Sequence, residues 1–215
     1  MEFKDFLSKI SQIKTILSNK SYEINDFQSI MTPKERLNYN MDLVKNPKKA
    51  AVLAFFYPKK NKTFFLLTLR ANYKGAHASQ ISFPGGKKDK IDTNLIETAL
   101  RESFEEVNIE KESVSDIIKL SKLYIPPSNF WVFPYVGISK SKPNFINNYE
   151  VEKLIEVDID DLLNNNNITN SIITTSYAKD MNVPCFLLNN HIVWGATAMI
   201  LSEIKELIKL TYDKV

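Results

Sequence analysis

The stretch FPGGKKDKIDTNLIETALRESFEEVNI, residues 83–109, decides the fold of this 215-residue chain. A Pro-Gly-Gly turn leads through a polar loop into a predicted helix. Either Asp92 or Asn94 caps its start, the latter in a capping box with Glu97. Asn108 suits the helix end, because after glycine asparagine best tolerates the left-handed conformation found there. The helix has an apolar stripe for burial, made of Leu95, Ile96, Ala99, Leu100, Ser103 and Val107.

The other side of this helix, which we expect to be exposed, carries an acidic array, R-E-x-x-E-E, that runs from Arg101 to Glu106. Glu102 and Glu106 lie one turn apart on the same face, with Glu105 beside them. A charge run is usually a solvated surface, but these glutamates crowd the C-terminal turns, where the helix dipole disfavours negative charge. Arg101 can reach Glu97 or Glu105, but one guanidinium does not neutralise four glutamates. A divalent cation would, since Mg²⁺ takes oxygen ligands and commonly binds one or two carboxylates plus substrate phosphates. We therefore predict a metal-binding catalytic helix.

The composition is that of a soluble globular protein of ordinary domain size, with 44% hydrophobic and 25% charged residues. The net charge of +3 is too small to require a nucleic-acid partner, and it permits an anionic substrate. Cys185 is the single cysteine, which excludes a disulfide framework and predicts a core thiol in a reducing compartment. We find no signal-length or membrane-length apolar run, so we expect a cytoplasmic protein without a membrane partner.

Hydrophobic periodicity predicts an amphipathic helix over residues 3–17, for packing or for a homodimer contact. Thr32 and Glu35 form a capping box that predicts a second helix, ending near Leu43. A closing helix is expected at 195–210 and a helical turn at 158–163. Pro134 predicts an edge strand or a bulge. Strands are expected at 50–57, 63–70, 117–125, 131–139, 153–157, 172–177, 184–188 and 191–194. This mixture predicts an α+β or α/β fold with a mixed sheet.

Five residues of the opening stretch resemble the Nudix box of Nudix hydrolases: Gly86, Arg101, Glu102, Glu105 and Glu106. The interval between the glycine and the arginine is one residue longer than usual. The segment LLTLRANYKGAHASQISFPGG, residues 66–86, is similar to the upstream signature of the Nudix subfamily that acts on coenzyme A. Residues 132–136 and 194–198 also look like this subfamily. Three positions depart from the signature: Ala71, Gly75 and Ser79. We expect Lys74 to supply the positive charge that is lost at Gly75.

The resemblance implies a Nudix-type α/β/α sandwich with a mixed sheet over residues 46–215, preceded by a helical extension over residues 1–45. It implies metal-dependent hydrolysis of a diphosphate bond in a nucleotide derivative, without nucleic acid as a partner. Coenzyme A or its thioesters would give adenosine 3',5'-bisphosphate and 4'-phosphopantetheine. Two alternatives remain open, another Nudix substrate such as ADP-ribose or NADH, and a nucleotide-binding module without turnover.

The same resemblance implies the roles of the site residues. Mg²⁺ or Mn²⁺ would be held by three carboxylates and one backbone carbonyl, from Glu102, Glu106, Glu105 and Gly86. Glu102, Arg101 and Glu105 are the expected catalytic residues, with Arg101 orienting the glutamates. The general base is Glu102 or a glutamate of a later loop, Glu150 or Glu152. The expected substrate-binding residues are Arg70, Lys74, His77 and Gln80. Trp131 and Phe133 are expected in the core rather than stacked on an adenine.

Overall fold

The computed structural model of this chain describes residues 1–18, 25–37, 40, 42, 44–71, 79–175 and 179–212. The strands of its main sheet are β1 (Lys48–Lys59), β2 (Lys62–Arg70), β3 (Ile81–Ser82), β4 (Gly85–Lys87), β5 (Asp116–Lys119), β6 (Leu123–Ile125), β7 (Phe130–Ile138) and β8 (Val151–Asp158). The order is β3-β2-β1-β7-β5, with β4 paired to β1, β6 to β7 and β8 to β2. Because β1 and β7 are parallel and their other neighbours antiparallel, the sheet is mixed, as predicted.

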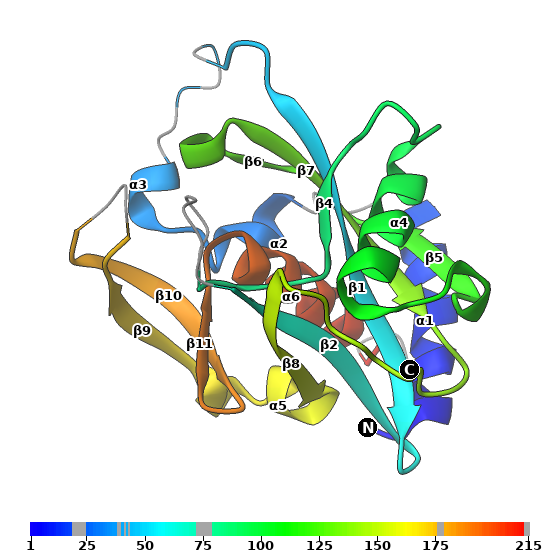
Figure 1. The fold of residues 1–215 in the computed structure, drawn as a ribbon. Helices are drawn as coiled ribbons and strands as arrows, with labels where there is room; N and C mark the ends of the chain where they lie inside the picture. Colours follow the sequence, from blue (N-terminus) through cyan, green and yellow to red (C-terminus); the bar gives the residue numbers. More distant parts are fainter. Residues whose placement is uncertain are drawn as a thin grey trace.

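A second sheet and six helices complete the described chain (Figure 1). The second sheet has the order β11-β10-β9. Its strands are β9 (Ile168–Ile173), β10 (Met181–Leu188) and β11 (His191–Trp194). The helices are α1 (Phe3–Ser18), α2 (Asn25–Ser29), α3 (Lys34–Leu37), α4 (Leu95–Val107), α5 (Ile159–Leu163) and α6 (Gly195–Lys209). Within the described part of the chain, no helix combines the length and the apolar character needed to cross a bilayer.

Helices cover both faces of the main sheet. Neighbouring side chains of β1 point to opposite faces, and apolar residues on both faces need cover. Leu53 and Phe55 belong to one hydrophobic cluster with Leu100 of α4. Phe56 points to the opposite face and belongs to the cluster that includes α1 and α6. There the ring of Phe6 stacks on Phe56, with 4.9 Å between the ring centroids. The expected α/β/α sandwich is confirmed, and the predicted N-terminal helix packs on the core of its own chain. Its role as a homodimer contact stays a prediction.

The strands β1 and β2 separate at the centre of the molecule (Figure 1). They pair only beside their hairpin, where residues 56–59 oppose residues 62–65. Beyond that point β4 pairs with β1 at residues 50–52, and β3 pairs with β2 at residues 68–69. Residues 83–84 therefore join β3 to β4 across the opening between the two diverging strands. This opening brings the Pro-Gly-Gly turn against α4.

The structure corrects four predictions of secondary structure. The strand expected over 117–125 is two strands, because β7 pairs with β5 at Tyr135–Ile138 and with β6 at Phe130–Val132. Pro134 lies between these two stretches. Its missing N–H therefore removes no backbone hydrogen bond to β5 or β6. The edge position expected for it is wrong, since β7 has neighbours on both sides.

The second helix, expected to end near Leu43, is a single turn, α3, in the described part, and α2 precedes it. Residues 38, 39, 41 and 43 lie outside the described residues. Asn40, which the structure describes, is not helical, and asparagine is a poor helix former. The strand expected at 172–177 is β9, shifted towards the N-terminus, and residues 176–178 lie outside the described part. Cys185 is buried in the core, as predicted.

Candidate active site

The Pro-Gly-Gly turn needs both of its glycines. Gly85 has a φ of 144°, and a Cβ at this position would lie 2.4 Å from the carbonyl oxygen of Ala51. At Gly86 a Cβ would lie 2.3 Å from Oε2 of Glu102. The first glycine thus lets β4 approach β1, and the second lets a carboxylate of α4 lie directly against the backbone of β4.

Helix α4 begins and ends where the sequence predicts. The Oδ1 atom of Asn94 accepts the backbone N–H groups of Ile96 and Glu97, at 2.9 and 3.0 Å. Asn108 ends the helix in the left-handed conformation, with φ 59° and ψ 40°. Glu97 does not complete a capping box, because its carboxylate binds Lys111 at 2.8 Å. The helix is therefore fixed at both ends by asparagines, and its register presents the acidic array towards β4.

Arg101 connects the carboxylates of the array. Its Nη2 donates to Glu102 at 2.9 Å, and its Nη1 donates to Glu105 at 3.0 Å. Asp92 holds the guanidinium from the other side, accepting from Nε at 2.8 Å and from Nη2 at 3.0 Å. The hydrogen bonds from Arg101 keep the pKa of Asp92 well below its usual range. Of the two partners predicted for Arg101, Glu97 and Glu105, the structure shows Glu105. Asp92 anchors the arginine, and Asn94 caps the helix.

Glu106 is buried, with only 3% of its surface exposed, whereas the acidic side of the helix was expected to face solvent. Its Oε2 accepts the N–H of Gly85 at 2.9 Å, and its Oε1 accepts Nη1 of Arg70 at 3.2 Å. Burial raises the pKa of Glu106 to about 7, although the Gly85 N–H and the charge of Arg70 favour ionisation. The turn at Gly85 and the end of β2 explain the burial, because both pack over this carboxylate.

A further carboxylate, Glu150, joins this group from the connection between β7 and β8. The N–H of Asn148 donates to the carbonyl of Glu106 at 3.0 Å, which fastens the connection to the end of α4. Glu150 then lies 3.9 Å from Nη2 of Arg70. Burial raises the pKa of Glu102, and the negative charges of Glu105 and Glu150 add to this effect. The other loop candidate, Glu152, is exposed on β8.

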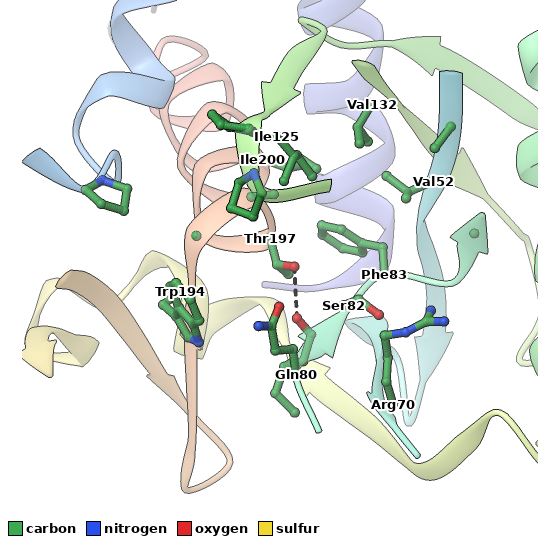
Figure 2. A pocket seen from close by; sticks show the side chains of 18 of the residues that line it. Val52, Arg70, Gln80, Ser82, Phe83, Ile125, Val132, Trp194, Thr197 and Ile200 are labelled. Carbon is green, nitrogen blue, oxygen red and sulfur yellow. Dashed lines mark hydrogen bonds between the residues drawn. The ribbon is translucent and has the colours of Figure 1, made fainter. Parts of the chain in front are cut away.

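A cavity of about 520 Å³ adjoins the carboxylates, a volume typical of small-molecule sites. Arg70, Gly85 and Gly86 line the end beside these carboxylates. Much of the remaining wall is apolar. Figure 2 labels the following apolar side chains, which come from β1, the β3–β4 connection, β6, β7, β11 and α6: Val52, Phe83, Ile125, Val132, Trp194 and Ile200. The hydroxyl of Thr197 donates to the carbonyl of Ile81 at 2.9 Å and ties α6 to β3. The arrangement can hold a large, weakly polar group beside a cluster of carboxylates.

Of the expected substrate-binding residues, Arg70 and Gln80 line the cavity. Lys74 and His77 lie outside the described residues. Ser79, which replaces a glycine of the resembled signature, has a φ of 57°, a conformation that favours glycine.

The two aromatic residues expected in the core do not line the cavity among its described residues. Phe133 packs against the hydrophobic cluster under α4. The ring centroids of Trp131 and Tyr124 are 5.5 Å apart. Tyr124 belongs to β6, which pairs with β7 on the side away from β1. Neither ring is therefore placed to stack on a ligand in this cavity.

Comparison with known proteins decides the family. The NUDIX domain model matches residues 47–174. The chain belongs to the Nudix family. Nudix hydrolase NudL of Yersinia pestis is 32% identical over 191 residues, which cover 87% of this chain and 94% of that protein. The activity of a Nudix hydrolase, cleavage of a diphosphate bond, is therefore that of this chain.

Two solved structures share the fold of this Nudix hydrolase. The Nudix hydrolase RenU of M. smegmatis has a TM-score of 0.50 and 14% identity, covering 79% of this chain and 88% of that one. The MutT/nudix family protein of Enterococcus faecalis also has a TM-score of 0.50, with 17% identity, covering 91% of this chain and 75% of that one. At these identities the likeness concerns the fold alone.

Nudix hydrolases generally use divalent metal ions, and the carboxylates here fit such an ion. Glu102 and Glu106 offer hard oxygen donors. The charge of Glu102 raises the pKa of Glu106, and the charge of Glu150 raises the pKa of both, a repulsion that a cation would relieve. In the described ranges, no three His, Cys, Asp or Glu side chains form a metal-binding group by themselves. In proteins, Mg²⁺ is commonly held by one or two carboxylates together with substrate phosphates.

Sequence reasoning missed several residues of the site. Asp92 carried a signal, since it lies nine residues before Arg101 in the loop that precedes α4. Trp194 and Thr197 lie in the segment 194–198, which the resemblance noted without a role. Arg36 lines the cavity from a segment outside residues 47–174, and no local pattern connects it to the site.

Proposed function

We propose that this Nudix hydrolase cleaves the diphosphate bond of coenzyme A or its thioesters. The products would be adenosine 3',5'-bisphosphate and 4'-phosphopantetheine. The observation that carries the proposal is the mainly apolar cavity of about 520 Å³ that opens beside Gly86 and Arg70. Such a cavity suits one large moiety attached to a diphosphate, and the signature-like segment 66–86 supplies two residues of its wall, Arg70 and Gln80.

The proposal assigns Mg²⁺ or Mn²⁺ to Glu102 and Glu106, with Glu105 and the carbonyl of Gly86 as further ligands. When bound, such an ion neutralises phosphate charge and lowers the pKa of water. Arg101 keeps Glu102 and Glu105 in place and is itself fixed by Asp92. In this division of labour Arg101 is a positioning residue, and the glutamates are the groups that meet the metal and the substrate.

Arg70 holds Glu106 and lines the cavity, so we assign it the additional task of contacting a substrate phosphate. For the general base we propose Glu150 or Glu102. Glu150 is the better supported of the two loop candidates, because it lies beside Arg70 and raises the pKa of both Glu102 and Glu106. A carboxylate in this position can accept a proton from water.

We also propose the division of the chain into a helical extension, residues 1–45, and a Nudix hydrolase domain, residues 46–215. The family match over residues 47–174 supports the boundary at the start of β1. The extension shares the hydrophobic cluster of the sheet and α6, so it belongs to the folded unit.

The substrate can be tested by incubating the purified protein with Mg²⁺ and coenzyme A, ADP-ribose, NADH or a diadenosine polyphosphate. We expect the highest kcat/KM for coenzyme A. If coenzyme A is the poorest of the four, the substrate assignment fails and another Nudix substrate takes its place. If none is cleaved while a nucleotide binds in calorimetry, the chain is a binding module.

A pair of variants of α4 links any turnover to the site. Glu102→Gln removes a carboxylate that lies against Gly86, and we expect it to reduce kcat by about 100-fold or more, the scale expected when a metal site is disturbed. Glu97→Gln is the matched control, because Glu97 lies on the same helix and pairs with Lys111 at the surface. Equal activity of the two variants would contradict the assignment of Glu102.

A further inference from the structure

The wall of the cavity opposite the catalytic carboxylates comes from the N-terminal segment. Pro33 and Arg36 of the α3 region line the cavity together with Ile125, Pro126 and Pro127. In Figure 1, α3 and α4 lie on opposite sides of the view, with β4 and β6 between them. The cavity therefore extends from the carboxylates to a segment that the family match over residues 47–174 does not include.

Buried polar contacts hold this wall in place. The amide of Gln28, on α2, donates to Oε2 of Glu203 at 2.7 Å and to the carbonyl of Ser121 at 3.0 Å. Both Gln28 and Glu203 are buried, at 6% and 0% exposure. The hydroxyl of Ser202 donates to the carbonyl of Phe27 at 2.7 Å. Because unpaired buried polar groups are costly, these contacts fix α2 on α6 and hold the following turn at the cavity.

Arg36 brings a permanent positive charge to this end of the cavity. Its Nη2 donates to the carbonyl of Tyr124, which orients the guanidinium beside β6. The guanidinium does not lose its proton in proteins, and its planar fork of five N–H donors matches phosphate oxygens. A cation in a mainly apolar wall is favourable when the ligand supplies an anion there.

We propose that Arg36 binds a second phosphate group of the substrate, at the end of the cavity away from the diphosphate that is cleaved. The substrate class is then a nucleoside diphosphate derivative that carries a further phosphate. This inference rests on the proposed function, since it requires the diphosphate to lie at Glu102 and Glu106. It makes Arg36 a specificity residue and not part of the bond-breaking machinery.

The test uses two pairs of substrates whose members differ by one phosphate: coenzyme A with 3'-dephospho-coenzyme A, and NADPH with NADH. For at least one pair, wild type should prefer the phosphorylated member. Arg36→Gln should lower kcat/KM for that member by about tenfold or more, the scale of a hydrogen bond to a charged group, mainly through KM. The loss in kcat/KM for the member without the phosphate should be smaller, so that the preference for the phosphorylated member falls. Arg36→Lys keeps the charge without the fork and should retain part of the preference.

Lys34→Gln is the matched control, because Lys34 lies exposed on the same helix and the substitution removes the same charge. Its substrate preference should equal that of wild type. A loss of the same size for both members of each pair in Arg36→Gln, or an equal loss in Lys34→Gln, would overturn the role of Arg36. If wild type cleaves only NADPH and NADH, coenzyme A is overturned as substrate. The preference within that pair then decides the role of Arg36. Inactivity of wild type on all four compounds would overturn both.

Discussion

Replacing Glu106 by glutamine tests the burial of this carboxylate and its role together. In wild type, burial raises the pKa of Glu106 from 4.5 to about 7. A shift of that size corresponds to roughly 3 kcal/mol between the two protonation states. The folded protein holds the proton more tightly than the unfolded chain does. The contribution of Glu106 to stability is therefore fully present below about pH 4.5 and is lost as the pH rises through about 7.

Glutamine does not titrate, so Glu106→Gln removes this dependence. At pH 5 the free energy of unfolding of the variant should be close to that of wild type. A protonated carboxyl and an amide both retain one acceptor for Gly85 or Arg70. Between pH 5 and pH 8.5 the difference in the free energy of unfolding should move by roughly 3 kcal/mol in favour of the variant. Urea denaturation in EDTA at the two pH values measures this difference.

Glu105→Gln is the control, since Glu105 lies beside Glu106 and its side chain is 52% exposed. Its difference from wild type should change by less than about 0.5 kcal/mol over the same range, as for an ordinary surface substitution. If the difference in the free energy of unfolding between Glu106→Gln and wild type is the same at both pH values, Glu106 does not titrate as a buried group. With Mg²⁺ present, Glu106→Gln should also lose about 100-fold or more in kcat, and unchanged hydrolysis would refute its role in metal binding.

Three further substitutions test the surroundings of the site and the core. Asp92→Asn weakens the anchor of Arg101. We expect kcat to fall by about 10- to 100-fold and the free energy of unfolding to fall by about 1–3 kcal/mol. An unchanged kcat would contradict the anchoring role. Gly86→Ala places a Cβ 2.3 Å from Oε2 of Glu102, so kcat should fall by about tenfold or more, and wild-type kinetics would show that the carboxylate need not lie there. Burial lowers the pKa of Lys205 to about 8, so urea denaturation should show wild type gaining stability as the pH rises from about 8 to 10.5. Lys205→Met should lack this gain, and parallel curves for the two proteins would contradict the burial of the ammonium group.

Much of the fold was readable because it depends on neighbours close in sequence. The caps at Asn94 and Asn108 are contacts within one turn, and both are where the sequence indicates. The stripe of the N-terminal helix and the strands of the hairpin follow from periodicity. Elements that depend on distant partners were predicted less well. The break between β5 and β6 follows from Pro134 in a strand that pairs with both, and no pattern within residues 116–125 announces it.

The candidate site divides in the same way. The acidic array and the two glycines are contiguous, so their chemistry could be read directly. Burial of Glu106 could not, because it depends on Gly85 and Arg70, which come 21 and 36 residues earlier in the chain. Helical spacing places a side chain on a face, but it does not say what covers that face.

The sequence by itself determined a Nudix hydrolase with its carboxylates at the end of one helix and a turn that only glycines allow. It did so because these features lie within short segments whose spacing fixes their geometry. The tertiary structure decided which glutamate of the stretch 83–109 is buried and how Asp92 holds Arg101. It also decided that Pro33 and Arg36 of the N-terminal segment line the cavity. These depend on packing between segments as distant as Gln28 and Glu203, which are 175 residues apart.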